Sequence, residues 1–382
     1  MALRVGVLTF HCSNSCGAVL QAYAMCKTIE ELGCSPCVID YRPKFLSASP
    51  PPRSQRPLGI LEKVWRKWHN RQFAEAWNNV VRDRRFERFR REFLPTTKRT
   101  YWNIEELRAD PPGVDVCVCG SDQIWNLNLF GERLGLDPTF FLDFVPPAVR
   151  RVAYAPSLGG VAFPQDVRDE VAVLLKKFSA LSGRENDVGA LVKQLTGRDA
   201  PTVLDPSLLI DDYSAVIRKP KWPPRRYILA YPLDYSQPFV ECVRRAKELL
   251  NLPVVNIGRD RLPGADVNRC SLGPSEWLGW MRDASFVCTN SFHGTAYSLL
   301  FRRNFVAFSF LRRPANNVRM QGILEQVGLS ERFLADAAPL AEGGLCRRAV
   351  DYSKVVPLLQ AAISRSRQYL KNALYATPDS AN

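Results

Sequence analysis

The chain lacks several features that would narrow its function at once. It has no apolar run long enough to span a bilayer, and only three of its 382 residues are histidine. It also has no HExxH, no GxSxG, no Walker loop ending in Lys-Ser/Thr and no complete GxGxxG. These absences argue against a membrane-spanning protein, a zinc protease, a serine hydrolase and a site for ATP or a dinucleotide.

Cysteine usage gives little support to a metal site or a disulfide framework. The sequence has 11 cysteines, an odd number, and they are spread along the chain. Cys34 and Cys37 have CxxC spacing, but no second pair or histidine cluster completes a zinc site. We therefore expect no metal, and a reducing compartment in which most cysteines are small core residues.

The N-terminal residues resemble a buried strand more than a signal peptide. Their apolar stretch is short, and polar residues from Cys12 to Ser15 follow it without a clear small-residue cleavage site. We therefore predict a cytoplasmic protein.

Charge is strongly biased to the basic side. The formal net charge of +14 favours an anionic partner, which leaves open a phosphorylated metabolite, an acidic glycan, a nucleic acid or an anionic lipid. Because no nucleic-acid-binding module is recognisable, nucleic acid is not expected.

The first half of the chain alternates strands, polar turns and helices. Residues 3–10 are typical of a strand, residues 18–32 of a helix ended by Gly33, and residues 37–41 of the next strand. Such a βαβ unit predicts a parallel sheet with a right-handed crossover. Further strands are expected over residues 114–119, 152–155, 178–181 and 202–204.

A second α/β series follows a segment rich in proline and charge, residues 219–226. The pattern therefore predicts an α/β protein of two domains, residues 1–218 and 225–345, around a cleft, with a C-terminal helix over residues 350–375. In the second series, strands are expected at 227–231, 254–257, 284–288 and 304–310, and helices at 239–250, 274–281 (capped by Ser275), 296–301 and 318–328.

The N-terminal domain carries an insertion over about residues 47–95. It combines a Ser- and Pro-rich loop with a strongly basic segment, residues 60–99, in which apolar residues recur near helical spacing up to Phe93. Packing of one or two surface helices on the sheet explains this pattern. Docking on an anionic membrane or on an acidic substrate explains it too, and both interpretations stay open.

The turn around His293 is the most informative of several polar turns that follow predicted strands. Ligands bind at the carboxyl ends of parallel strands in open α/β sheets. An imidazole at a helix N-terminus can contact an anion and move a proton near neutral pH. The alternative is that the histidine caps its own helix, while Ser291 accepts a hydrogen bond from a helix amide that has no partner within the helix.

Two other turns hold candidate site residues. A guanidinium such as that of Arg184 suits bidentate recognition of a carboxylate or phosphate, and a surface ion pair with Glu185 is the alternative. Asp122 is placed to orient or deprotonate a hydroxyl, or to cap the helix that follows it.

Taken together, the turns resemble those of the polysaccharide pyruvyl transferase family. The resemblance covers about residues 3–330, and the motifs occur in the family's order. They are Ser15–Ala24, Gly120–Asn126, Ala153–Ser157, Arg184-Glu185, Leu204–Ser207 and Ser291–Thr295.

The resemblance implies a GT-B-like fold of two Rossmann-like domains, with the acceptor side in the first domain and the donor side in the second. It implies transfer of pyruvate from phosphoenolpyruvate to the hydroxyls of a sugar or glycan, without a metal or nucleotide cofactor. A lipid-linked glycan is one acceptor that this reaction could use. His293 and Asp122 would be catalytic. Donor contacts are expected from Arg184, Ser291, Gly294, Thr295 and Arg319, and acceptor contacts from Asn14, Gly17, Gln21, Ser121 and Gln123.

One departure from the family pattern concerns the donor site. Some members carry arginine two positions before the histidine, where this chain has Ser291. Arg319, or Arg312 and Arg313, are candidates to supply that cation. Two other functions remain open: a GT-B-like glycosyltransferase with a nucleotide-sugar donor, and a catalytically altered binding protein.

Overall fold

The computed structural model describes residues 2–43, 45, 71–129, 136–312, 314–342 and 344–376. The Ser- and Pro-rich loop, residues 60–70 of the basic segment and Arg313 lie outside these ranges. Among the described residues, no helix is both long and apolar enough to cross a bilayer.

The first half of the chain forms a five-stranded parallel sheet. Its order is β2-β1-β3-β4-β5, so the chain adds β2 on one side of β1 and β3 on the other. Both faces of the central strands are covered, which explains their near-continuous apolar sequence. The strands are β1 (Arg4–Leu8), β2 (Ser35–Val38), β3 (Val116–Cys119), β4 (Arg150–Ala153) and β5 (Ala180–Leu181).

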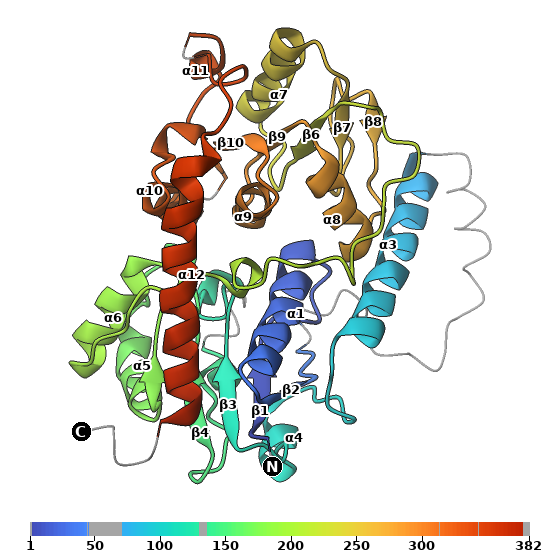
Figure 1. Cartoon of the computed structure of the whole chain (residues 1–382). Helices are drawn as coiled ribbons and strands as arrows, with labels where there is room; N and C mark the ends of the chain where they lie inside the picture. The colour runs from blue at the N-terminus through green and yellow to red at the C-terminus, as the bar shows by residue number, and fades with distance from the viewer. Residues whose placement is uncertain are drawn as a thin grey trace, which may run out of the picture.

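The helices of this half include α1 (Cys16–Glu31), α3 (Arg71–Phe93), α4 (Ile104–Ala109), α5 (Gln165–Lys176) and α6 (Asn186–Thr196). Helix α1 is buried on almost every side, because it lies between its own sheet and the second half of the molecule (Figure 1). This is why its sequence is apolar nearly all round and not along one stripe.

The second half forms a six-stranded parallel sheet in the order β11-β10-β9-β6-β7-β8. Here too the direction of strand addition reverses, between β6 and β9. The strands are β6 (Ile228–Tyr231), β7 (Val254–Asn256), β8 (Val267–Asn268), β9 (Phe286–Thr289), β10 (Asn304–Phe308) and β11 (Phe333–Leu334). The helices are α7 (Gln237–Leu250), α8 (Pro274–Asp283), α9 (Phe292–Leu300), α10 (Val318–Gln326) and α11 (Ala338–Glu342).

Helix α12 (Tyr352–Tyr375) runs along both halves (Figure 1). Near its start, the Tyr352 hydroxyl donates to the carbonyl of Arg303, at 2.6 Å, in the second half. Near its end, Ser366 accepts a hydrogen bond from the Leu204 amide and Tyr369 donates to the Ala153 carbonyl, both in the first half. The helix therefore ties the two sheets together.

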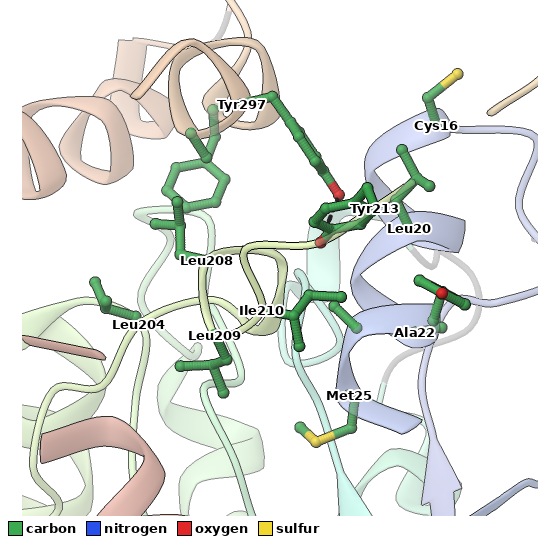
Figure 2. Packing of buried hydrophobic residues seen from close by; sticks show 14 of the residues in the cluster. Cys16, Leu20, Ala22, Met25, Leu204, Leu208, Leu209, Ile210, Tyr213 and Tyr297 are labelled. Carbon is green, nitrogen blue, oxygen red and sulfur yellow. Dashed lines mark hydrogen bonds between the residues drawn. The ribbon is translucent and has the colours of Figure 1, made fainter. Parts of the chain in front are cut away.

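Apolar packing also joins the halves. The short helix η3 (Pro206–Leu208) and the residues after it pack against Leu20 and Met25 of α1 (Figure 2). Tyr297 of α9 donates its hydroxyl to that of Tyr213 at 3.0 Å, and the two rings lie edge to face. Tyr213 also contacts Tyr23 of α1, with ring centroids 6.0 Å apart, so it links α9 to α1.

Two expectations drawn from the sequence were wrong, and two short strands were not expected. Residues 202–204 are not a strand, because only an isolated bridge pairs Gly183 with Thr202. Helix α8 is capped by Gly273 and begins with Pro274, so Ser275 lies inside it. Finally, the two-residue strands β8 and β11 at the sheet edges were not expected, since runs this short carry no periodicity.

Within the basic segment, residues 71–93 form the single helix α3. Phe86 and Phe89 are buried, whereas Trp77 and Val80 are exposed. Contacts with α8 hold the helix against the second half of the molecule. Packing therefore accounts for one face of α3 and leaves a basic face in solvent.

Candidate active site

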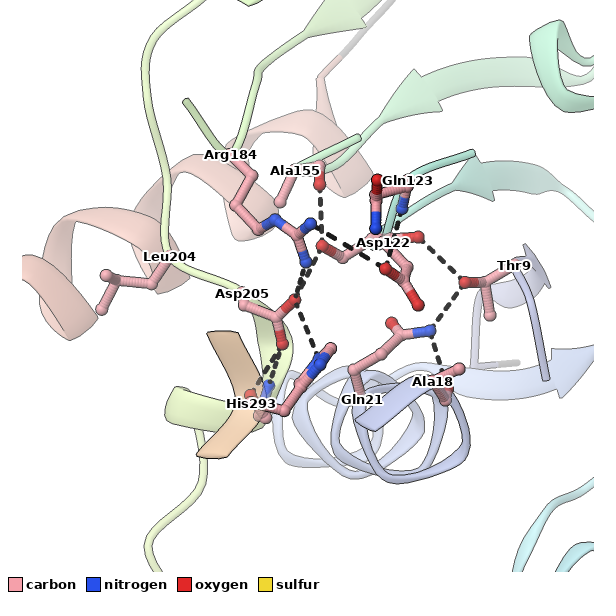
Figure 3. Close-up of polar contacts among 12 residues, drawn as sticks. Thr9, Ala18, Gln21, Asp122, Gln123, Ala155, Arg184, Leu204, Asp205 and His293 are labelled. Carbon is pink, nitrogen blue, oxygen red and sulfur yellow. Dashed lines mark hydrogen bonds and ion pairs between the residues drawn. The ribbon is translucent and has the colours of Figure 1, made fainter. Parts of the chain in front are cut away.

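The candidate site lies where the carboxyl ends of the two sheets meet. Loops after β3 and β5 supply Asp122 and Arg184, and the segment before η3 supplies Asp205 (Figure 3). The turn between β9 and α9 supplies His293 from the other half. The loops after β3 and β9 lie at the points where the direction of strand addition reverses in the two sheets, which is the usual ligand position in such sheets, whereas Arg184 follows the edge strand β5.

Asp205 is the residue through which the others are connected. Its Oδ2 accepts a hydrogen bond from Arg184 Nη1 at 2.8 Å and lies 3.0 Å from the Ser121 hydroxyl, while Oδ1 accepts from the amide and hydroxyl of Ser207 (Figure 3). Burial opposes ionisation of this carboxyl, but His293, Arg184 and Ser207 together lower its pKa. Asp205 is therefore a buried carboxylate.

Sequence reasoning did not name Asp205 as a site residue. It treated the Asp-Pro-Ser segment only as a turn at a strand end. The available signal was that this turn matched one of the family motifs, like those of Arg184 and His293. Nothing in the local sequence shows that its carboxylate points back to both of them.

Arg184 is fully enclosed by acceptors and an aromatic ring. Nε donates to Glu185 at 3.0 Å, Nη1 donates to Asp205, and Nη2 lies 3.8 Å from the carboxylate of Asp122. The guanidinium also stacks over Phe292, 4.5 Å from the ring centroid. The pair with Glu185 that the sequence offered as a surface contact thus exists, but it is buried. Although burial opposes its charge, these carboxylates raise the pKa of Arg184.

His293 lies at the contact between the two halves. Its Nε2 is 3.7 Å from Oδ2 of Asp205 and has no hydrogen-bond partner among the described residues. A Cβ atom on Gly17 would lie only 2.1 Å from Nδ1 of His293, so only glycine allows α1 to approach the imidazole this closely. Burial lowers the pKa of His293, although Asp205 and Asp122 oppose that effect.

The other side chains of the His293 turn form hydrogen bonds with backbone atoms of the same turn. The side chain of Ser291 accepts a hydrogen bond from the Gly294 amide at 3.4 Å and caps α9. Gly294 lies against Thr289 of β9, and Thr295 is fully buried and donates its hydroxyl to the Ser291 carbonyl. These three residues shape the turn. Their predicted contacts with the donor stay predictions.

Arg319 contributes a second guanidinium, at the start of α10. Its Nε donates to the Asn316 carbonyl at 3.2 Å, and its two Nη atoms make no hydrogen bond or ion pair with any described residue. Burial and the nearby Arg184 lower its pKa to about 10, so it is charged at neutral pH. Arg312, by contrast, lies 2.9 Å from Asp234 and is 76% exposed.

Arg319, Arg184 and Asp205 line a groove of about 520 Å³ between α6 and α10, here called the Arg319 groove. Its lining also includes Asn186, in the first turn of α6. Glu185 precedes that helix, Asp187 lies in its first turn, and the Val188 amide donates to the Glu185 carbonyl at 3.2 Å. The groove therefore combines the guanidinia of Arg184 and Arg319 with the carboxylates of Glu185 and Asp205.

The predicted acceptor residues fall into two groups. Gln21 donates to the Thr9 hydroxyl at 2.7 Å and to the Ala18 carbonyl, and its Oε1 has no hydrogen-bond partner among the described residues. Figure 3 shows Gln21 on the side of α1 that faces Asp122. Ser121 and Gly17 also lie at the candidate site, because Ser121 donates to Asp205 and Gly17 lies against His293.

Asn14 and Gln123 lie outside that group. Asn14 donates to Asp83 and accepts from Arg90, both on α3, at 2.7 and 3.1 Å. Gln123 accepts from Asn126 at 2.7 Å, and its amide donates to the side chain of Asp122. No helix begins directly after Asp122, since the next one, η1, starts at Leu127, so Asp122 does not cap a helix as the sequence suggested.

Comparison with solved structures bears on the fold. The S. aureus protein MnaA, solved with UDP, superposes with a TM-score of 0.51 at 10% identity, and 99% of this chain and 98% of that chain are covered. UDP-N-acetylglucosamine 2-epimerase from Rickettsia bellii gives 0.50 at 10% identity, with 98% and 97% covered. Both are GT-B-like, and the GT-B-like arrangement expected for this chain is confirmed.

Comparison of sequences identifies the family. No curated protein matches the chain significantly. The family model described as polysaccharide pyruvyl transferase matches residues 16–310, which include α1, the carboxylates at Asp122 and Asp205, Arg184 and the His293 turn. The chain therefore belongs to the polysaccharide pyruvyl transferase family.

Proposed function

We propose that this site transfers a pyruvyl group from phosphoenolpyruvate to two hydroxyls of a sugar in a glycan or glycoconjugate, with release of phosphate. The observation that carries the proposal is a set of buried polar atoms without hydrogen-bond partners among the described residues. Arg184 Nη2, His293 Nε2 and Gln21 Oε1 all belong to it. Buried groups of this kind are costly unless a ligand completes their bonding.

The donor fits the cations of the site. Phosphoenolpyruvate carries a carboxylate and a phosphate, and the Arg319 groove offers the guanidinia of Arg184 and Arg319. A guanidinium can bind either group through two hydrogen bonds. Because Arg184 already contacts carboxylates of the protein, Arg319 has the greater free capacity and is the main donor-binding residue in this proposal.

The chemistry requires one proton to be added and two to be removed. A proton adds to the methylene carbon of phosphoenolpyruvate, which creates positive charge at the carbon that bears phosphate. One sugar hydroxyl attacks that carbon and loses its proton, the bond to the phosphate oxygen breaks, and the second hydroxyl closes the ketal. One hydroxyl proton thus replaces the proton given to the methylene carbon, and the other leaves with phosphate.

His293 is the acid in this scheme. Its lowered pKa makes it neutral in the free protein near pH 7. Binding of an anionic donor raises the pKa of a neighbouring imidazole. His293 would therefore become protonated in the complex with the donor, where the acid is required. Asp205 stabilises the resulting imidazolium, and Asp122 takes a proton from the acceptor hydroxyl that Gln21 helps to hold.

Phosphate release from phosphoenolpyruvate tests the proposal. The purified protein is assayed with free and lipid-linked sugars as acceptors, and we expect release that depends on the acceptor and is abolished in His293→Ala. Arg184→Ala should abolish it too, and thermal unfolding shows whether that variant still folds.

The same experiment separates the alternatives. Binding of a UDP-sugar but not of phosphoenolpyruvate in calorimetry would favour a glycosyltransferase. Binding of phosphoenolpyruvate without phosphate release from any acceptor would favour a binding protein. Near wild-type turnover in His293→Ala would show that the catalytic assignment is wrong.

Since phosphoenolpyruvate is a metabolite of the cytoplasm, the proposal also implies a cytoplasmic reaction.

A further inference from the structure

A second groove outside the candidate active site gathers positive charge. It lies between α3 and the segment of residues 218–222, has a volume of about 640 Å³, and is here called the α3 groove. In Figure 1, α3 stands beside α8, near the chain segment that leads into the second sheet. The cations that line it include Arg84, Arg88, Lys219, Lys221 and Arg269.

The side chains of these five cations have no hydrogen bond or ion pair with any described residue. The carboxylate of Glu276 lies in the groove, but Arg85 and Arg218 approach it at 3.9 and 3.8 Å. On α7, by contrast, Arg244 is paired with Glu241 and Glu248. Unpaired like charges repel one another, so this concentration favours a bound anion.

Aromatic side chains give the α3 groove a second kind of contact. Trp222 lines it and is 87% exposed, and the buried Trp280 forms part of its wall. An indole next to guanidinium and ammonium groups offers an apolar face for a sugar ring and charged donors for acidic substituents. A concave site also suits a chain-like ligand better than a flat bilayer surface.

The α3 groove adjoins a second hollow that reaches the start of α1. Leu272 lines both this groove and a neighbouring hollow of about 360 Å³, which extends to Asn14 and Cys16. Among the residues that the structure describes, one hydrogen bond crosses between α3 and the loop around Leu272, from Arg85 to the Ser271 carbonyl at 2.9 Å. Cys16 begins α1, the helix whose Gly17 lies against the His293 imidazole. The two hollows therefore run along α3 as far as the start of α1.

We propose that the α3 groove binds an acidic oligosaccharide, as the part of the acceptor that lies away from the reacting sugar. This inference rests on the proposed pyruvyl transfer. Its chemistry is consistent with that reaction, because each pyruvate ketal adds a carboxylate to the glycan. A glycan that already carries such groups would bind more tightly than a neutral one.

Binding of tetragalacturonate, compared with neutral maltotetraose, tests the inference. In calorimetry with the full chain, we expect tetragalacturonate to bind at low salt, maltotetraose to bind far more weakly, and added salt to reduce the difference. The double variant Arg84→Gln/Arg88→Gln should weaken tetragalacturonate binding about tenfold, as expected for the loss of two exposed ion pairs. The matched control Arg365→Gln/Lys371→Gln removes two exposed charges from α12 and should bind like wild type.

Other results would overturn the inference. These are equal binding of tetragalacturonate by the groove variant and wild type, no binding at all, or equal loss in the control. Binding of anionic phospholipid vesicles or of single-stranded DNA that depends on Arg84 and Arg88, without oligosaccharide binding, would identify another partner. Phosphate release from phosphoenolpyruvate with a small neutral sugar separates this inference from the proposed function, because it needs pyruvyl transfer but not the groove. If wild type and the groove variant both release phosphate while the binding results above fail, only this inference is wrong. If wild type releases no phosphate, pyruvyl transfer itself is wrong.

Discussion

The two halves of the molecule contribute differently to the candidate active site. From the first half, Arg184, Asp205, Asp122 and Ser121 contact one another, and most of their charges are already paired. From the second half, His293 and Arg319 present nitrogen atoms with no hydrogen-bond partner among the described residues. The first half therefore acts mainly as a charged scaffold, in which Arg184 Nη2 and Gln21 Oε1 are among the buried atoms left without a hydrogen-bond partner in the described residues, and the second half supplies His293 and Arg319.

This difference teaches how a buried site can be both stable and reactive. A buried ion pair is strongly destabilised when one partner is removed, so the scaffold residues hold each other in place. The groups that do chemistry must instead keep a free hydrogen-bonding atom until the ligand arrives. Substitutions in the two halves should therefore fail in different ways.

The largest effect is expected at His293. His293→Gln keeps the size of a planar polar side chain but cannot deliver a proton, so kcat for phosphate release should fall on the order of 10²–10⁴-fold. The unfolding temperature should change little. Ser298→Ala, one turn along α9, serves as the control for disturbance of the helix. A similar fall in that control would assign the effect to helix packing.

Asp205→Asn breaks the scaffold and should mainly reduce stability. It leaves the buried guanidinium of Arg184 with one fewer carboxylate, at a cost of about 3 kcal/mol in the free energy of unfolding. Thermal or urea unfolding measures this loss, and Asp211→Asn at the surface is the matched control. If Asp205→Asn were as stable as the control, the role of Asp205 as the connecting residue would have to be abandoned.

Arg319→Gln should affect the donor more than the fold. Loss of a guanidinium with free Nη atoms should raise KM for phosphoenolpyruvate by about 10–100-fold, with a smaller change in kcat. Arg312→Gln is the matched control, because Arg312 lies beside Asp234 and away from the groove. An equal rise in KM for both variants would point to long-range charge and not to direct contact.

The smallest expected effect is a displacement between two pH profiles. If protonated His293 is the acid, kcat/KM falls as pH rises through the pKa of the free protein, which burial holds below its ordinary value of 6.5. Donor charge raises that pKa in the complex, so kcat should fall only at a higher pH. Profiles of kcat and kcat/KM for phosphoenolpyruvate measure the displacement. Coincident profiles would contradict loading of the acid by the donor.

Much of the fold followed from local patterns. The strand at Arg4–Leu8 and the helix at Cys16–Glu31 lie within two residues of their predicted bounds, because long buried strands and helices have clear periodicity and end signals. The expected strand over residues 202–204 failed, since its apolar character comes from packing beside η3 and not from sheet pairing.

The site was predictable in kind but not in arrangement. Polar residues at strand ends identified Arg184, Asp122 and His293 as candidates. The local sequence did not show that Arg184 is buried among carboxylates, nor that Arg319, and not Arg312, faces the groove. These facts depend on how α10 and the η3 segment are placed by contacts made far along the chain.

What the sequence determined by itself is the set of local structures, the cationic balance and the family to which the chain belongs. Each depends on residues close together in the chain or on motifs in order. Only the tertiary structure decided that Gly17 and His293 touch, that Asp205 joins residues of both halves, and that seven cations share one groove. The physical reason is that these arrangements arise from packing between the two sheets, where residues more than a hundred positions apart decide each other's burial, charge and hydrogen bonds.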